Sequence, residues 1–325
     1  PFMNPLTTLR VASVQLQHKA NDKDYNLAKI HQFIEMAASE KVNLLVFPEM
    51  CITGYWHVPK LPAQQVYALS EKLADSASLK SIKQKAQQYA MAIGVGLIER
   101  DNNNNLYNTW VVCMPDGSLQ KHRKLHAFEH PVICSGDQYT VFDTPWGIKM
   151  GILICWDNNL VENARATALL GADILLAPHQ TGGTHSRSPH SMKPIPMALW
   201  ENRQQDPQAL QAAFQGEHGK GWLMRWLPAR AHDNGMFIIF SNGVGRDEEE
   251  VRTGNAMVID PYGRIVKESC AIEDDMVVTD IDLTLLPEST GRRWLTGRRP
   301  ELYQILTTRQ GNEQDPISVR FGNKD

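Results

Sequence analysis

Three residues with reactive side chains each come directly after a segment of the chain that is expected to be a strand. Glu49 follows Val-Phe-Pro, Lys124 follows a turn and a short predicted strand, and Cys155 follows Gly-Ile-Leu-Ile. Positions where a rigid element gives way to a loop are common for catalytic groups. A thiol has an ordinary pKa of ~8.5, so it needs a nearby base or positive charge to act as a nucleophile at neutral pH.

Each of the three also has a structural explanation that involves no chemistry. Glu49 is either a carboxylate beside low-dielectric surroundings, with the raised pKa of a general base, or a strand-ending residue that points to water. Lys124 lies in the basic cluster 121–126, which is either a solvated surface or the source of a cation for an oxyanion. Cys155 is either a thiolate favoured by a following helix N-terminus or a small buried hydrophobic residue.

The combination of the three favours the chemical interpretation. Each follows a separate strand-like segment, so one sheet can bring all three to the same edge. A thiol–imidazole pair between Cys155 and His126 would leave Glu49 and Lys124 unexplained. Asp157, just after the cysteine, is interpreted as a helix cap. Three other cysteines are interpreted as buried hydrophobic residues: Cys51, Cys113 and Cys270.

The elements that must position these residues alternate along the chain. Alternating or continuous apolar runs predict strands at residues 9–16, 42–48, 92–98, 107–114, 149–154, 174–177, 237–241, 256–259 and 277–282. Helical spacing predicts helices at residues 25–39, 66–74, 78–89, 160–170 and 222–232. A Pro-Asp-Gly turn at 115–117 predicts a hairpin whose second strand ends near Lys124. Strands joined by both hairpins and helical crossovers predict a layered α/β sandwich.

Two segments depart from this alternation. Residues 182–221 are long and rich in His, Gln, Pro and Gly, which is typical of a functional loop or a disordered insertion. Residues from about 284 onward form a polar, Arg-rich tail. No repeat, low-complexity tract or linker divides the chain, so we expect a single domain.

The overall composition argues against several classes of protein. The chain has 325 residues, 42% hydrophobic and 21% charged, with a net charge of −3. Without a basic field, we expect no nucleic-acid partner. No apolar run approaches the ~18 residues of a membrane span, so we expect no membrane partner. Residues 1–8 lack a signal-peptide pattern and the five cysteines contain no CxxC, so we expect a cytoplasmic protein.

The residues around the three reactive side chains resemble the carbon–nitrogen hydrolase family, also called the nitrilase superfamily. The resemblance runs from Leu9 to about Tyr303. Its anchors are Phe-Pro-Glu at 47–49, Arg-Lys-Leu-His at 123–126 and Ile-Cys-Trp-Asp at 154–157, with further agreement at 169–174 and 299–303. Three anchors in this order, each in a strand context, make the resemblance specific.

The resemblance implies a four-layer αββα sandwich over residues 9–283, and a tail at 284–325 that spans a homodimer or higher homo-oligomer. It implies that Glu49 is the general base and acid, Lys124 the oxyanion cation and Cys155 the nucleophile. Glu129 matches a second glutamate that positions the other three. No metal or organic cofactor is implied.

The implied reaction is hydrolysis of a small-molecule amide, carbamoyl compound or nitrile. Cys155 would attack the carbon and Glu49 would pass the proton to the departing nitrogen, while Lys124 and the backbone N–H of Trp156 hold the oxyanion. Water would then hydrolyse the thioester. Asp157 resembles the amidase and carbamoylase branches, because nitrilases usually carry Glu at this place.

The substrate is less well defined by the sequence. Carbamoylases of amino acids often carry arginines shortly after the cysteine, where this chain has asparagines, although Arg187 or Arg203 could serve instead. The 182–221 segment is expected to cover the entrance and to set substrate size. Five residues near the predicted strand ends are candidates for substrate binding: Tyr55, Trp56, Trp156, His179 and Gln180.

Three other readings remain open from the sequence. The first is a nitrilase, which matched amide and nitrile substrates would separate from an amidase. The second is a catalytically silent scaffold that binds a partner or metabolite, although such a protein has no need of Glu49, Lys124 and Cys155 together. The third is a redox-sensing thiol, which lacks an evident resolving cysteine near Cys155.

Overall fold

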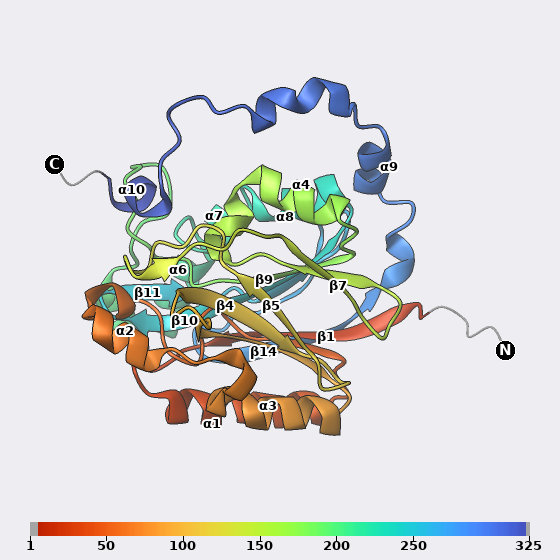
Figure 1. Cartoon of the computed structure of the whole chain (residues 1–325). Helices are drawn as coiled ribbons and strands as arrows, with labels where there is room; N and C mark the ends of the chain where they lie inside the picture. Colours follow the sequence, from red (N-terminus) through yellow and green to blue (C-terminus); the bar gives the residue numbers. More distant parts are fainter. Residues whose placement is uncertain (1–5, 323–325) are drawn as a thin grey trace.

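Within residues 6–322, which a computed structural model of the chain describes, fourteen strands form one sheet whose two halves pack face to face (Figure 1). The first half contains β1 (Thr8–Leu16), β2 (Leu44–Val46), β3 (Ala92–Arg100), β4 (Leu106–Cys113), β5 (Leu119–Arg123), β6 (Ile133–Cys134) and β14 (Asp275–Asp282). The second half contains β7 (Thr140–Asp143), β8 (Lys149–Ile152), β9 (Ile174–Pro178), β10 (Phe237–Asp247), β11 (Glu250–Thr253), β12 (Met257–Ile259) and β13 (Ile265–Glu268).

The strand order brings several carboxyl ends to one edge of the sandwich. The order is β5-β4-β3-β2-β1-β10-β9-β8-β7, and the halves join through parallel pairing of β1 with β10. β2 is parallel to β1 and β3, and β8 is parallel to β9. β5 runs in the same direction as β3 because each is antiparallel to β4. The segments that follow β2, β5 and β8 therefore begin at the same edge.

The helices form the two outer layers and the C-terminal tail. They are α1 (Lys23–Ser39), α2 (Ala63–Leu69), α3 (Ala77–Gln88), α4 (Val161–Leu169), α5 (Met197–Glu201), α6 (Pro207–Gln215), α7 (Lys220–Leu223), α8 (Leu227–Asn234), α9 (Thr290–Thr296) and α10 (Pro316–Phe321). The buried faces of α1 and α3 pack on the first half of the sheet, and those of α4 and α8 pack on the second. The predicted αββα sandwich is confirmed. No helix in the described part of the chain is long and apolar enough to cross a membrane.

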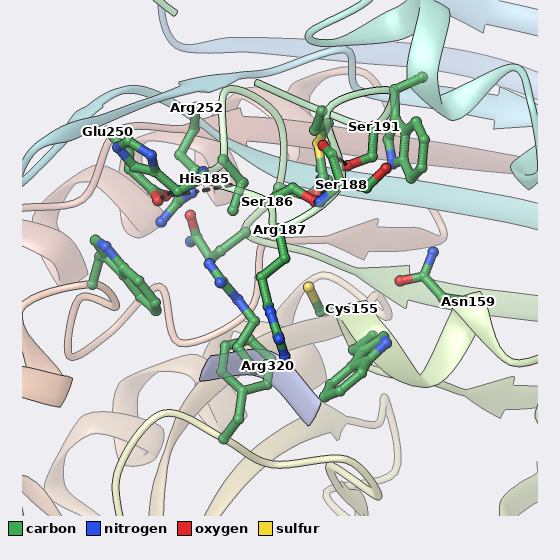
Figure 2. A pocket seen from close by; sticks show the side chains of 18 of the residues that line it. Cys155, Asn159, His185, Ser186, Arg187, Ser188, Ser191, Glu250, Arg252 and Arg320 are labelled. Atoms are coloured by element: carbon green, nitrogen blue, oxygen red, sulfur yellow. Dashed lines mark hydrogen bonds and ion pairs between the residues drawn. The ribbon is translucent and has the colours of Figure 1, made fainter. Parts of the chain in front are cut away.

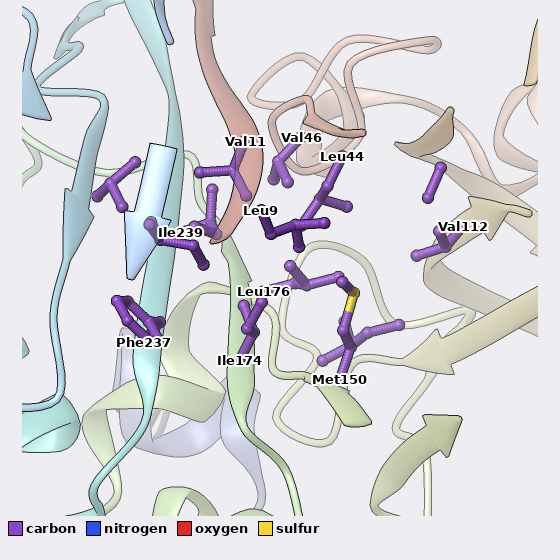
Figure 3. Close-up of a cluster of buried hydrophobic side chains, with 14 of the residues drawn as sticks. Leu9, Val11, Leu44, Val46, Val112, Met150, Ile174, Leu176, Phe237 and Ile239 are labelled. Atoms are coloured by element: carbon purple, nitrogen blue, oxygen red, sulfur yellow. The ribbon is translucent and has the colours of Figure 1, made fainter. Parts of the chain in front are cut away.

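The main core lies between the two halves of the sheet. Figure 3 shows Leu9 and Val11 of β1 facing side chains of the opposite half, such as Ile174 and Phe237. On the same strand, Val14 points to the other face, where it packs under the helices of the first half. This alternation is the period of two expected of a strand. Each such side chain contributes about 1.5–3 kcal/mol by burial, so the sandwich is a rigid base for the loops at its edge.

Several predicted elements differ from the structure in their extent. The strand predicted at 42–48 is only three residues long, because the chain turns into the loop that carries Glu49. The helix predicted at 66–74 begins and ends earlier, at Ala63 and Leu69. The helix predicted at 222–232 is two helices, and Pro228 lies in the first turn of the second. β10 continues to Asp247 and forms an unpredicted hairpin with β11.

The two segments that depart from the alternation both contain helices. The 182–221 segment carries α5, α6 and the start of α7, and Trp200 and Phe214 bury against β10 and β11. It is therefore not disordered as a whole. After β14 the tail forms α9, which contacts α8, and then a 3-10 helix at Pro300–Thr307. Figure 1 shows the tail passing along one side of the molecule to place α10 near the opposite end.

Candidate active site

The loops after β2, β5 and β8 carry Glu49, Lys124 and Cys155 to a common place. The ammonium of Lys124 donates a hydrogen bond to Oε1 of Glu49 at 2.7 Å, although 75 residues separate them in the chain. The backbone N–H of Lys124 donates to the carbonyl of Asn108 at 2.8 Å, which fixes this loop to β4. The charges of Glu49 and Lys124 both act on the thiol of Cys155. The predicted convergence of the three residues at one edge is therefore observed.

The carboxylate of Glu49 is completely buried, and its two oxygens differ. Oε1 accepts hydrogen bonds from Lys124 and from Nδ2 of Asn108, the latter at 2.8 Å. Oε2 has no hydrogen-bond partner among the described residues. Burial raises the pKa of Glu49 to about 7, although the charge of Lys124 opposes this change. Glu49 is therefore poised to exchange a proton near neutral pH through Oε2.

Glu129 lies on the other side of Lys124. Its Oε1 accepts hydrogen bonds from Lys124 at 2.5 Å, from Asn108 at 3.1 Å and from the hydroxyl of Tyr55 at 3.5 Å. Burial alone would lower the pKa of Lys124, but the carboxylates of Glu129 and Glu49 outweigh it and raise that pKa well above its usual value. Lys124 therefore stays charged. Two of its three N–H donors bind carboxylates, and the third is left to bind a substrate.

Cys155 is held in an uncommon backbone conformation. Its φ is +48°, in the left-handed region that a non-glycine residue adopts at a cost of about 1–3 kcal/mol. It begins the short 3-10 helix Cys155–Asn159 rather than an α-helix. Burial raises the pKa of its thiol to about 12, and the Glu49 carboxylate adds to this effect. Burial therefore opposes the thiolate that a following helix N-terminus would favour.

Asp157 connects the cysteine turn to the lysine loop. Its buried carboxylate accepts hydrogen bonds from the backbone N–H groups of Leu125, His126 and Ile154 at 3.0–3.1 Å, and contacts Nε2 of His122 at 3.2 Å. The predicted capping role accounts only for the hydrogen bond from Ile154. The side chain also joins the cysteine turn to the lysine loop, which lies about 30 residues earlier in the chain.

The other cysteines occupy two kinds of environment. Cys51 and Cys113 are buried, as predicted. Cys270 is exposed, and the prediction that it is a buried hydrophobic residue is wrong. The reason is its place in the connection between β13 and β14, outside the sheet core.

A cavity of about 420 Å³ opens beside Cys155 (Figure 2). Four of the five residues predicted to bind substrate line it: Tyr55, Trp56, Trp156 and Gln180. The 182–221 segment contributes Thr184 to Ser188, Ser191 and Met192 to the wall. That it covers the entrance and sets substrate size stays a prediction. Arg252, Val319 and Arg320 also line the cavity, and no sequence pattern indicated them.

His179 and Gln180 follow β9 but have different surroundings. The side chain of Gln180 donates to the carbonyl of Glu49 at 2.8 Å, and its backbone N–H favours the thiolate of Cys155. His179 lies behind the cavity wall rather than in it, with Nε2 3.0 Å from Nδ2 of Asn158 and its ring 4.8 Å from that of Phe240. Burial lowers the pKa of His179 to about 3, so this ring is neutral. Its place favours a supporting role over direct substrate contact.

The fold is shared with known proteins. The model of the carbon–nitrogen hydrolase family matches residues 10–288, and the chain belongs to this family. The resemblance noted from the sequence is confirmed.

Relatives in this family carry several activities in their names. An omega-amidase NIT2 of Mus musculus is 27% identical, over 92% of this chain and 98% of its own. An (R)-stereoselective amidase of Pseudomonas is 28% identical, over 86% of both chains. A nitrilase of Pyrococcus abyssi is 26% identical, over 86% of this chain and 91% of its own. A Nesterenkonia amidase solved with butyramide has the same fold, with a TM-score of 0.66 at 21% identity over 92% of this chain and 97% of that one.

Proposed function

We propose that the chain hydrolyses small amides or N-carbamoyl compounds through a thioester on Cys155, with release of ammonia or an amine. The observation that carries the proposal is the unpartnered Oε2 of Glu49, buried beside a thiol that burial keeps protonated. A base with a pKa of about 7 can take the proton of a thiol with a pKa of about 12 only as the sulfur attacks. We therefore place the proton transfer in the step that forms the carbon–sulfur bond.

In the first half of the reaction, the sulfur of Cys155 bonds to the carbonyl carbon and its proton moves to Glu49. The carbonyl oxygen becomes an oxyanion, which the remaining N–H of Lys124 and the backbone N–H of Trp156 stabilise. Loss of one such donor commonly costs ~2.7–4 kcal/mol of barrier stabilisation. Glu49 then returns the proton to the nitrogen, the carbon–nitrogen bond breaks and ammonia or an amine leaves.

In the second half, Glu49 takes a proton from a water molecule whose oxygen bonds to the thioester carbon. The carbon–sulfur bond breaks, the acid leaves and the proton on Glu49 returns to the sulfur. Glu129 does not exchange protons in this scheme. It positions Lys124 and Asn108, and both of these donate to Glu49.

The experiment is a panel of short amides, N-carbamoyl compounds and matching nitriles, with ammonia and acid measured together. We expect turnover of amides or carbamoyl compounds, and none by Cys155→Ala. Turnover of nitriles alone would replace the proposal by its main alternative, a nitrilase, which relatives of that name support. An absence of turnover with binding retained would favour the silent scaffold.

We also propose that the tail contributes to a homodimer in the cytoplasm. Apolar side chains of its 3-10 helix are more than half exposed in the single chain, with Leu302 at 56%, Ile305 at 62% and Leu306 at 64%. Such a group of exposed apolar residues is typical of an interface. Sedimentation at micromolar concentration should give a dimer, and Ile305→Asp should weaken it. A monomeric wild-type protein would contradict this part of the proposal.

A further inference from the structure

Gln180 contacts both the loop that carries Glu49 and the loop that carries Cys155. Its Nε2 donates a hydrogen bond to the backbone carbonyl of Glu49 at 2.8 Å. The peptide held by this bond leads into Met50, whose φ of +48° lies in the strained left-handed region. The backbone N–H of Gln180 stabilises the thiolate of Cys155. The placement of this one residue therefore affects how Glu49 and Cys155 meet.

The side-chain amide of Gln180 has a fixed orientation. If its oxygen faced Glu49, two carbonyl oxygens would oppose each other, so Nε2 is the atom that points there. Oε1 is buried and has no hydrogen-bond partner within residues 6–322. Gly243 of β10 makes room for this oxygen, because a Cβ at that position would lie 1.9 Å from Oε1 and 2.9 Å from Cδ. The second N–H of Nε2 is left to bind one further acceptor.

His18, just after β1, supplies that acceptor. Its Nδ1 lies 3.4 Å from Nε2 of Gln180, which is 162 residues further along the chain. On the other side of the ring, Nε2 of His18 lies 3.1 Å from Oδ1 of Asp247 at the end of β10. Both side chains are buried, with exposed fractions of 5% for His18 and 4% for Asp247. A continuous series of contacts therefore runs from Asp247 through His18 and Gln180 to Glu49.

Asp247 determines which ring nitrogen of His18 carries the hydrogen. Burial alone would raise the pKa of Asp247, but the contact with His18 and the charge of Arg252 outweigh burial and lower that pKa below its usual value. An ionised carboxylate can only accept, so Nε2 of His18 carries a hydrogen and donates it, although the backbone nitrogen of Tyr55 is 3.3 Å from the same atom. In the neutral ring, Nδ1 then has a free lone pair that accepts from Gln180.

We propose that His18, held by Asp247, is a positioning residue that acts on the reaction through Gln180. With its amide fixed, Gln180 holds the Glu49 peptide in place and keeps its own backbone N–H beside the sulfur of Cys155. This inference rests on the proposed hydrolase function and adds to it a residue that does not line the cavity. No proton passes through His18 in this scheme. Loss of the acceptor at Nδ1 frees the amide to rotate, which should slow formation of the carbon–sulfur bond and leave substrate binding unchanged.

Two substitutions of His18 separate this role from a structural one. His18→Asn keeps an oxygen acceptor at the place of Nδ1 but cannot reach Asp247, whereas His18→Gln reaches Asp247 but has no acceptor at the place of Nδ1. We expect His18→Gln to lower kcat for a short amide by about 10- to 100-fold with KM unchanged, as for a small misplacement of reacting groups. His18→Asn should keep most of the wild-type kcat. A purely structural role predicts the reverse order, because Gln fills more of the space and keeps the contact with Asp247.

Gly243→Ala displaces the same amide from its other side. The added methyl group occupies the position of Oε1 of Gln180, so this variant should reproduce the loss of kcat while His18 stays in place. If His18→Gln does not fold, Gly243→Ala decides the question.

Alkylation of Cys155 by iodoacetamide at fixed pH gives a second measurement, since it requires the thiolate but no turnover. The rate is followed by mass spectrometry of the peptide that contains Cys155, and it should fall in His18→Gln and in Gly243→Ala. His31→Asn is the matched control, because His31 belongs to α1 in the outer layer. Its kcat and its alkylation rate should equal those of the wild-type protein.

The outcomes separate this inference from the function on which it rests. A wild-type kcat in His18→Gln or in Gly243→Ala, or a loss in His18→Asn as large as that in His18→Gln, would overturn the inference and leave the hydrolase intact. No turnover of any amide or carbamoyl compound by the wild-type protein would contradict the hydrolase itself. The alkylation rates would then still decide whether His18 and Gly243 place Gln180 beside the sulfur.

Discussion

Removal of the charge of Glu129 should move the pH dependence of the reaction without removing any group that exchanges protons. Glu49 and Glu129 bind the same ammonium, at 2.7 and 2.5 Å, so the bonded oxygens are at most about 5 Å apart. At an effective dielectric constant of ~20, two unit charges at this separation repel by about 3 kcal/mol. That energy corresponds to a change of roughly 2 in the pKa of Glu49.

The sign of the effect follows from which form of Glu49 is active. The repulsion from Glu129 is one of the causes that raise the pKa of Glu49 to about 7, after burial itself. The base form therefore disappears as the pH falls through about 7, and kcat/KM falls with it. In Glu129→Gln the pKa of Glu49 drops, so the acidic limb should move down by roughly 1–2 pH units.

The assay is the pH profile of kcat/KM for a neutral amide, whose own charge does not change over this range. Glu99→Gln is the control, because this buried carboxylate pairs with Lys121 and Arg123 rather than with Lys124. The acidic limb of its pH profile should lie at the same pH as in the wild-type protein. If the acidic limb of Glu129→Gln stays at the wild-type pH or moves to higher pH, Glu49 is not the base coupled to Glu129.

Three further substitutions test how the site and its scaffold are held. Asp157→Asn places an amide NH₂ where one oxygen accepts backbone N–H groups, so the free energy of unfolding in urea should fall by about 1–3 kcal/mol and turnover should slow. Gly94→Ala places a Cβ 1.9 Å from Cη2 of Trp110, so overpacking should lower the thermal midpoint, at a cost of about 1–3 kcal/mol. Arg252→Met leaves two buried carboxylates without their cation and should cost about 3–5 kcal/mol in the same urea titration. If any of these variants is as stable as the wild-type protein, the contact named for it does not stabilise the fold.

The sequence predicts those site residues whose positions depend on the strand that directly precedes them. Glu49, Lys124 and Cys155 each follow a strand, and the direction of that strand decides the edge at which they emerge. Asn108 gives no such signal, because it lies within β4 and its carboxylate partners are 59 and 21 residues away. Its role depends on which loops the fold places over that strand.

The fold shows the same division. The αββα layers follow from periodicity, as in β1, where alternate residues face the inner core and the outer helices. The return of α10 to the cavity could not be predicted, because its contacts with Trp56 and Phe128 join segments far apart in the chain. The pKa of Cys155 could not be predicted either, since it depends on a degree of burial that spacing does not report.

The most direct test of the central claim is to trap the covalent intermediate. Wild-type protein is mixed with a short amide, quenched in acid within the first turnovers and digested for mass spectrometry. We predict an added mass equal to the substrate minus ammonia on the peptide that contains Cys155, and none in Cys155→Ala. An adduct on another residue during amide turnover, or turnover that persists in Cys155→Ala, would contradict the claim.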